Sequence, residues 1–143
     1  MNNKVQSISN AEWEVMRILW TLGNAKSKTI IDLLTKKNNW SESTIKTLIT
    51  RLKNKKIIGV KKEGNKNFYY CLVDEDEAYK MSIMHLFKEI CCMQYGSTLD
   101  YLINNIELSK NDIDGLIKTL EQKKAGAPDK VECKCLGGKS NEA

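Results

Sequence analysis

Apolar residues recur at three- and four-residue intervals over much of the chain, which is the spacing of one face of an α-helix. The first such segment starts after Ser9, which forms a capping-box pattern with Glu12, and ends at the next glycine. A second segment runs from its expected cap Ser27 to Lys37, and a third begins after the cap Ser41. The pattern therefore predicts three helices in the N-terminal part of the chain.

Alternating residues after the third helix predict a β-hairpin. Residues 57–62 and 67–73 are short β-compatible runs, and residues 63–66 between them supply the glycine and asparagine of a tight turn. We expect Phe68 and Tyr70 to share the strand face that packs on the helices, because side chains two residues apart in a strand point the same way. Three helices followed by a hairpin predict a winged helix-turn-helix domain.

The third helix has an apolar face and a polar face. The polar face carries short hydroxyls and long cations, and lysines cluster on the hairpin that follows. Such side chains contact base edges and phosphates when a helix enters the major groove of DNA. A solvated helix face is the alternative interpretation, and the basic hairpin favours DNA. The predicted DNA-binding residues are Ser43, Thr44, Lys46, Thr47, Thr50, Arg51, Lys61, Lys62 and Lys66.

Three further amphipathic segments fill most of the second half, with apolar stripes over residues 83–90, 99–106 and 113–120. Acidic residues 74–77 suit the N-terminus of the first of these helices, and Ser109 is the expected cap of the last. Helices of this length bury too little apolar surface to be stable alone. We expect a second copy of the chain as the partner. A compact monomer, with these helices folded onto the N-terminal domain, is the alternative.

The predicted fold is mainly α with a small β-hairpin, in three parts. Residues 1–73 form a winged-helix DNA-binding domain, and residues 74–124 form a helical dimerisation module. A glycine and the only proline of the chain end the last helix, so residues 125–143 are predicted to be a flexible tail.

Charge and composition narrow the class of protein. Residues 1–75 carry 14 Lys and Arg against 7 Asp and Glu, whereas residues 76–143 carry 9 against 11, so the basic half favours a polyanionic partner. The N-terminus lacks the apolar core of a signal peptide, and no run of about 18 apolar residues predicts a membrane span. We expect a cytoplasmic protein without a membrane partner. His85 is the single histidine and no phosphate-binding glycine loop occurs, so no enzyme is expected.

Two of the five cysteines predict a metal site. Cys133 and Cys135 lie in the tail, outside any packed pattern, and thiolates two residues apart can bind one soft metal ion such as Cu(I) or Zn(II). Lys130 and Lys134 are expected to lower the pKa of these thiols. One chain offers this pair only two ligands, and two chains would offer four.

The remaining cysteines receive a structural interpretation. Cys91 and Cys92 are adjacent on the expected fourth helix and point about 100° apart, so they cannot readily chelate one ion as a pair, and burial is favoured. Cys71 in the outgoing hairpin strand is interpreted in the same way. Whether Cys91 or Cys92 joins the metal site is not decided by the sequence.

Two segments resemble the BlaI/MecI penicillinase-repressor family. They are ISNAEWEVM at residues 8–16, with Leu19-Trp20 after it, and STIKTLITRL at residues 43–52, with Trp40 before it. Within that family, QKKAGA at residues 122–127, leading into the cysteine tail, is similar to the CopY-type copper-responsive repressors.

This resemblance implies a homodimeric winged-helix repressor that binds a palindromic operator of copper-homeostasis genes. It also implies that a zinc-loaded form holds operator DNA and that Cu(I) displaces zinc at the cysteine tail and releases the DNA. A copper chaperone is a candidate partner. The operator sequence, the regulated genes and the metal stoichiometry cannot be read from the chain.

The chain departs from the CopY pattern in its tail. A second Cys-x-Cys usually follows about five residues after the first, and Ser140 and Glu142 stand near those places. A site built by Cys133 and Cys135 of both protomers would restore four thiolates.

Two other functions remain as alternatives. One is a β-lactam-responsive repressor of the same family, which proteolysis in the dimerisation module would release; the Asn-Phe cleavage pair of such relatives corresponds here to Tyr101-Leu102. The other is a winged-helix protein-interaction module, which the lysine-tipped hairpin and the cationic face of the third helix disfavour.

Overall fold

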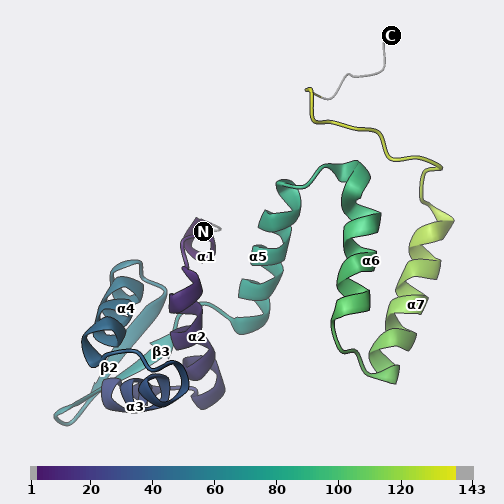
Figure 1. Ribbon diagram of the computed structural model, residues 1–143. Coiled ribbons are helices and arrows are strands. Elements are labelled where there is room, and N and C mark those ends of the chain that lie inside the picture. Colours follow the sequence, from purple (N-terminus) through teal and green to yellow (C-terminus); the bar gives the residue numbers. More distant parts are fainter. Residues whose placement is uncertain (1–2, 138–143) are drawn as a thin grey trace. The chain divides into compact units, whose positions relative to one another are not determined.

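The computed structural model describes residues 3–137 and divides the chain into two compact units, Met1–His85 and Leu86–Ala143 (Figure 1). Ser140 and Glu142, which stand where the second Cys-x-Cys was expected, lie outside the described residues. Helices and a small sheet make up the first unit, and helices dominate the second, so the predicted mainly α fold with a β-hairpin is confirmed.

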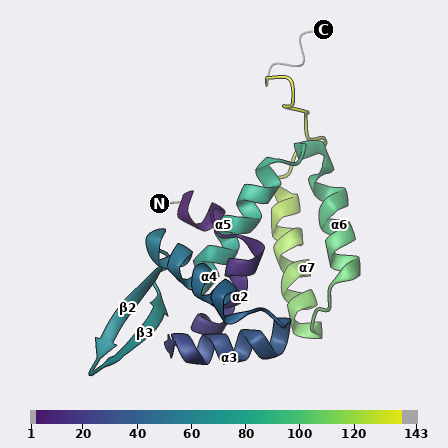
Figure 2. The same cartoon turned by 60° about the vertical axis from the view of Figure 1, so that its left-hand side comes forward.

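The first unit has the element order of a winged helix. Its elements are α1 (Asn3–Gln6), α2 (Asn10–Leu22), β1 (Ala25–Lys26), α3 (Ser27–Asn38), α4 (Glu42–Asn54), β2 (Ile58–Glu63), β3 (Lys66–Cys71) and the first turns of α5 (Glu75–Lys88). The paired strands β2 and β3 project from the three helices as a hairpin, which is the wing (Figure 2).

Capping residues set most of the predicted helix starts. Ser9 and Glu12 form the complete capping box of α2, and Ser41 accepts the Thr44 amide at the start of α4 (3.2 Å). Ser27 was wrongly expected to cap its helix. It is the first residue of α3, because the backbone at Lys26 is extended and pairs with the sheet, and Lys26 makes no side-chain cap.

The sheet has three antiparallel strands in the order β1-β3-β2, and β1 is a two-residue strand that the hydrophobic pattern did not reveal. The prediction that Phe68 and Tyr70 pack on the helices is wrong. Tyr69 and Cys71 take that face, because the pairing of Ala25 with Tyr69 fixes the register. The Phe68 ring lies instead under the Lys26 ammonium, 5.6 Å from the ring centroid.

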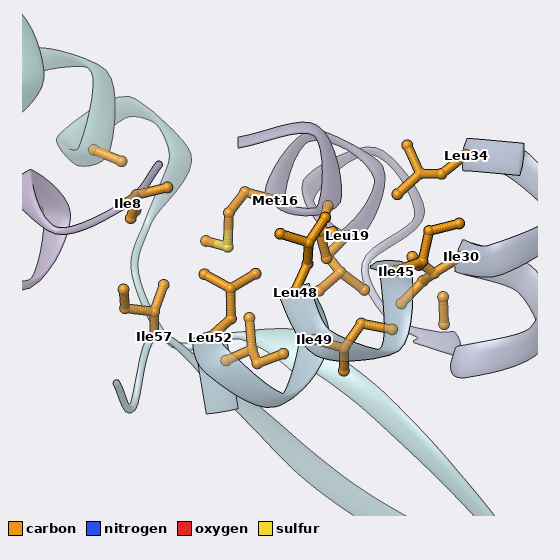
Figure 3. Packing of buried hydrophobic residues seen from close by; sticks show 14 of the residues in the cluster. Ile8, Met16, Leu19, Ile30, Leu34, Ile45, Leu48, Ile49, Leu52 and Ile57 are labelled. Carbon is orange, nitrogen blue, oxygen red and sulfur yellow. The ribbon is translucent and has the colours of Figure 1, made fainter. Parts of the chain in front are cut away.

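A continuous apolar core joins α2, α3 and α4 (Figure 3). The predicted apolar face of α4 is confirmed, since all four of its residues are buried against α2 and α3. In Figure 3 Leu48 and Leu52 point toward Met16 and Leu19 of α2, and Ile45 points toward Ile30 of α3. This packing turns the opposite, polar face of α4 outward. The four buried residues of α4 are Ile45, Leu48, Ile49 and Leu52.

A buried ion pair ties the start of α2 to the end of α4. Glu12 is only 2% exposed, and both of its carboxylate oxygens accept from the Lys55 ammonium, at 2.8 and 2.9 Å. Lys55 also donates to the Ser7 carbonyl at 2.6 Å. The pair thus satisfies a carboxylate that packing would otherwise leave uncompensated in the core.

Aromatic contacts attach the first turns of α5 to the winged helix. Tyr79 lies against both Trp13 and Trp20, with ring centroids 6.0 and 5.6 Å apart, and the Trp20 indole N–H donates to the Val73 carbonyl at 2.9 Å. Ala78 is fully buried beside them. The chain therefore continues from the wing into α5 without a flexible linker at this point, and the boundary expected at residue 73 stays a prediction.

The second unit contains the end of α5, the 3-10 helix η1 (Cys92–Gln94), α6 (Tyr95–Asn105) and α7 (Lys110–Ala125), and the described part of the tail, residues 126–137, has no helix or strand. Ser109 and Asp112 form the capping box of α7. The helix α5 ends at Lys88, so Cys91 and Cys92 do not lie on it as expected. Cys91 is instead the residue before η1.

Candidate nucleic-acid interface and cysteine cluster

The outer face of α4 presents all of the predicted helix contacts to solvent. Their side chains are exposed because the buried residues of the same helix face the core on its other side. The Arg51 side chain offers five N–H donors in a rigid fork, which suits guanine edges and phosphates. These exposed residues of α4 are Ser43, Thr44, Lys46, Thr47, Thr50 and Arg51.

The hydroxyls on this face are already oriented by the helix. Thr47 donates to the Ser43 carbonyl and Thr50 donates to the Lys46 carbonyl, both at 2.9 Å. Because each hydroxyl hydrogen is engaged, the oxygen presents its lone pairs outward as an acceptor. An acceptor in this position suits the amino group of cytosine or adenine in the major groove.

Lys46 is held differently from Arg51. Its ammonium forms an i, i+4 ion pair with Glu42 at 2.8 Å, and Lys46 in turn lowers the pKa of the Glu42 carboxyl. Both side chains are largely exposed, so the pair contributes little to stability. A phosphate contact by Lys46 would require this pair to open.

The wing carries a cluster of cations that includes one residue missed by the sequence analysis. Lys61, Lys62 and Lys66 are exposed on β2 and β3, as expected. Lys66 also lowers the pKa of the Lys26 ammonium, through a side-chain contact and the repulsion between two like charges. Crowded cations of this kind are stabilised by an anion such as a phosphate. Lys26 therefore joins the basic surface of the wing.

Three cysteine sulfurs of the second unit form a cluster. Cys91, Cys133 and Cys135 place their Sγ atoms within 4.8 Å of one another, and the Cys91 and Cys133 sulfurs are 3.9 Å apart. Cys133 and Cys91 are partly buried, and Cys135 is exposed. The two predicted tail cysteines are thus together, and Cys91 lies with them.

The pKa values within this cluster differ from the prediction. Neighbouring lysines were expected to lower the pKa of both tail thiols, but the pKa of Cys135 is raised to about 12, because hydrogen bonds with Cys91 and Cys133 and the proximity of these sulfurs disfavour its thiolate. The pKa of Cys91 is lowered, chiefly by the backbone N–H of Met93. Cys91 is therefore the preferred thiolate of the pair that it forms with Cys135.

Cys71 lies apart from the cluster, in the first unit, and is half-buried as expected. Burial, together with the nearby charge of Glu75, raises the pKa of its thiol to about 12. A thiol with such a pKa is a poor nucleophile and a poor metal ligand.

Alkylation should reveal this difference. At pH 8 we expect iodoacetamide to modify Cys71 at least about a hundredfold more slowly in the folded chain than in urea, where the pKa returns to about 8.5. The reason is that the folded chain keeps this thiol protonated. Peptide mass mapping over time measures both rates, and equal rates would contradict the burial of the thiol.

The contacts of Cys91 and Lys26 could not be read from the chain. Cys91 lies 42 residues from Cys133, in a segment whose helical pattern suggested continuation of α5. Lys26 precedes α3 and reaches the wing only because β1 pairs with β3. The only signal in the sequence for a third cysteine was the number of soft ligands in the tail, since two thiolates are too few for a complete metal site.

The helices of the second unit leave their apolar stripes uncovered. None of the residues of α6 and α7 is buried, and eight Leu and Ile side chains, seven on these helices and one at the C-cap of α6, are 39 to 57% exposed. These helices lie side by side and run in opposite directions (Figures 1 and 2). The uncovered residues are Leu99, Leu102, Ile103, Ile106, Ile113, Leu116, Ile117 and Leu120.

Within residues 3–137, no helix is both long enough and apolar enough to cross a membrane.

Comparison with known proteins gives a consistent result. The sequence profile of the family described as "Penicillinase repressor" matches residues 8–122. The chain is 45% identical over 139 residues to an uncharacterized 16.5 kDa protein in the ptsI 3' region of Latilactobacillus sakei, covering 97% of this chain and 95% of that protein. It is 34% identical to the methicillin resistance regulatory protein MecI of Staphylococcus aureus strain N315, covering 86% of this chain and all of MecI. A solved CopR repressor matches at 40% identity with a TM-score of 0.41, over 48% of this chain and 99% of that one.

Proposed function

The chain belongs to the penicillinase repressor family of DNA-binding transcriptional repressors, and from this premise we propose that it is a dimeric repressor that responds to copper. In this proposal the zinc-loaded dimer binds a palindromic operator of copper-homeostasis genes, and Cu(I) displaces zinc at Cys133 and Cys135 and releases the DNA. The main support for a copper response is the cluster of cysteine sulfurs in the second unit. A cytoplasmic location and delivery of copper by a chaperone are part of the proposal.

The exposed face of α4 and the wing support a specific mode of DNA binding. We infer that α4 enters the major groove, where Arg51 and the oriented hydroxyls of Thr47 and Thr50 meet base edges. The wing lysines, with Lys26, would then lie along a phosphate backbone. Phosphate contacts would position the domain, and contacts from α4 would supply the sequence preference.

The uncovered stripes of α6 and α7 support dimerisation. Full burial of an exposed Leu or Ile contributes about 1.5–3 kcal/mol. These eight side chains are 39 to 57% exposed, so covering the rest of each contributes roughly half of that amount, and together they favour a partner. A second copy presents the same stripes in the same order, and two-fold symmetry allows them to cover one another. Two winged helices would then meet two half-sites of a palindrome.

The donor set fits a soft metal ion. Thiolates select Cu(I) and Zn(II) over harder ions, and the clustered sulfurs can contact one ion after small movements. When bound, the ion would supply a cross-link between the tail and the remainder of the second unit. Cys133 and Cys135 would hold it from the tail, and the metal ion that occupies the cluster would bias the dimer toward or away from the DNA-binding geometry.

A second candidate function is supported by the relationship to MecI. In a β-lactam-responsive repressor, proteolysis within the dimerisation module would release the DNA. The corresponding bond, Tyr101-Leu102, lies in the middle of α6, so a protease would need that helix to open first. The interaction-module alternative loses its support, because this is a family of DNA-binding repressors.

The metal response is tested with the full-length chain and a Cys133→Ser, Cys135→Ser variant. Operator affinity is measured by fluorescence anisotropy with zinc and then with Cu(I), with Cys71→Ser as the matched control. We expect Cu(I) to weaken operator binding of the wild type and of the control, and to leave the double variant unchanged. Equal metal responses in all three chains would remove the copper proposal and leave the repressor.

The prediction for DNA recognition concerns the side chain of Arg51. Arg51→Ala should weaken operator binding by about 1–3 kcal/mol per half-site at fixed salt, because a bidentate contact is lost. Arg17→Ala is the control, since it removes the same charge from α2, where Arg17 pairs with Glu14. Titration of a labelled operator measures both, and an Arg51→Ala chain that binds like Arg17→Ala would contradict the placement of α4 in the groove.

A further inference from the structure

The tail cysteines have a third partner within the same chain. We propose that Cys91 joins Cys133 and Cys135 as a ligand, so that one chain holds one Cu(I) with three thiolates. This inference deepens the proposed function and rests on it for the identity of the metal ion. It replaces the missing second Cys-x-Cys with a residue from the segment between α5 and η1, without the need for a partner chain.

The positions of the sulfurs fit such a site. Three sulfurs placed about 2.3 Å from one ion in a plane lie about 4.0 Å from each other. The Cys91 and Cys133 sulfurs are already 3.9 Å apart, and all three lie within 4.8 Å of one another. Closure on an ion therefore needs a contraction of less than about 1 Å. Cys135 is exposed, so its side chain is free to make that movement.

Hydrogen bonds distinguish Cys91 from its neighbour Cys92. The Cys92 thiol donates to the Glu132 carbonyl at 3.0 Å, which anchors the tail beside the start of η1. Cys92 is not in the cluster of mutually close sulfurs, whereas Cys91 is. The Cys135 backbone N–H donates to the Cys133 sulfur at 3.4 Å, which holds these two residues of the tail close together. Cys92 is therefore not a ligand, and a serine hydroxyl at its place can make the same hydrogen bond to the Glu132 carbonyl, whereas Cys91 is the ligand.

The surroundings of the cluster suit the charge of this complex. One Cu(I) with three thiolates has a net charge of about −2. A hollow of about 210 Å³ beside Cys91 and Cys135 is lined by Lys88 and Lys134, among other residues. The hollow is also lined by Glu89, so its two ammonium groups exceed its one carboxylate and partly offset the negative charge of the complex. The hollow also gives an incoming ion access to the sulfurs.

The number of ligands separates copper from zinc. Structural zinc takes four ligands in tetrahedral geometry, so three thiolates leave it in need of a fourth donor from elsewhere. Cu(I) is satisfied by three soft ligands. Exchange of zinc for Cu(I) would therefore free the fourth donor and fasten the tail to Cys91, three residues after the end of α5. A change of this kind gives the two metals different effects on the dimer.

The test uses reduced, zinc-free, full-length protein under anaerobic conditions. Cu(I) is titrated against the chromogenic chelator bathocuproine disulfonate in the wild type, Cys91→Ser, Cys92→Ser and the Cys133→Ser, Cys135→Ser variant. Native mass spectrometry counts copper ions per chain. We expect one Cu(I) per chain in the wild type, affinity lowered at least about tenfold in Cys91→Ser, and affinity within about threefold of wild type in Cys92→Ser. The double variant should lose the site.

Several outcomes would overturn the inference. They are wild-type affinity in Cys91→Ser, one copper ion per two chains, or no Cu(I) binding by the wild type. Circular dichroism and operator binding of zinc-loaded Cys91→Ser establish that this variant folds. The two proposals fail separately: a chain that binds Cu(I) through Cys91 but keeps its operator refutes the copper response alone. A Cys91→Ser chain with wild-type affinity and normal release refutes only the role of Cys91.

Discussion

Leu116→Asp is expected to convert the proposed dimer into monomers and to remove high-affinity operator binding. Leu116 lies within the uncovered apolar stripe of α7, so dimerisation would bury the new carboxylate without a partner. An uncompensated buried charge costs about 3–5 kcal/mol, and two-fold symmetry imposes the cost twice. The dimer should therefore weaken at least about ten-thousandfold. Operator binding should fall with it, because each monomer meets only one half-site.

Sedimentation equilibrium measures the dimer constant directly. Asn111→Asp is the matched control, because it introduces the same carboxylate on the polar side of α7, about 160° around the helix from the start of the apolar stripe at Ile113. This variant should remain a dimer. A Leu116→Asp chain that dimerises like the control would show that the stripe is covered in some other way, and the compact-monomer alternative would then regain support.

Glu12→Ala should cause a clear loss of folding stability in the winged helix. The substitution leaves the Lys55 ammonium without the carboxylate that accepts two of its hydrogen bonds, and it removes half of the capping box of α2. Because the Lys55 side chain is 31% exposed and water can reach its ammonium, the loss is that of the hydrogen bonds to Glu12 and of the cap, about 1–3 kcal/mol. Urea denaturation followed by tryptophan fluorescence measures the change, and all three tryptophans of the chain lie in the first unit.

Glu14→Ala provides the contrast on the same helix. Glu14 forms ion pairs with Arg17 and Lys37 at the surface, and such pairs contribute about 0–1 kcal/mol. A double variant, Glu12→Ala with Lys55→Ala, should recover part of the loss, because no charge is then left unpaired. If Glu12→Ala and Glu14→Ala unfold at the same urea concentration, the ion pair between Glu12 and Lys55 does not stabilise the winged helix more than a surface pair does.

Local signals in the sequence predicted much of the fold. Capping boxes and helical periodicity located α2, α4 and α7, because these helices are amphipathic and their caps are local in sequence. The exposed stripes of the second half were also foreseen. The face of β3 that packs on the helices was not predicted correctly. A strand with consecutive aromatic residues has no alternation of apolar and polar side chains, and its register depends on pairing with the distant strand β1.

Among the functional residues, those on one helix face could also be predicted from local patterns, and those brought together by long-range contacts could not. The face of α4 follows from which residues of that helix are buried, so the sequence was sufficient to list it. Cys91 was assigned to a helix and to burial, because the end of α5 carries no capping signal that would have placed it in a loop. Its proximity to Cys133 is a long-range contact that no local pattern encodes.

In the proposed function, the exchange of zinc for Cu(I) and the binding of operator DNA affect each other. Because such an effect is equal in both directions, it can be measured on the wild-type chain without any variant. If replacing zinc by Cu(I) weakens operator binding by a certain factor, the operator must disfavour that exchange by the same factor, typically about 5–150-fold. The decisive measurement is the Cu(I)-for-zinc exchange constant of the wild-type chain, free and saturated with operator. We predict that the operator shifts this constant toward zinc by the factor found for DNA release. An exchange constant that is the same with and without operator would contradict the account.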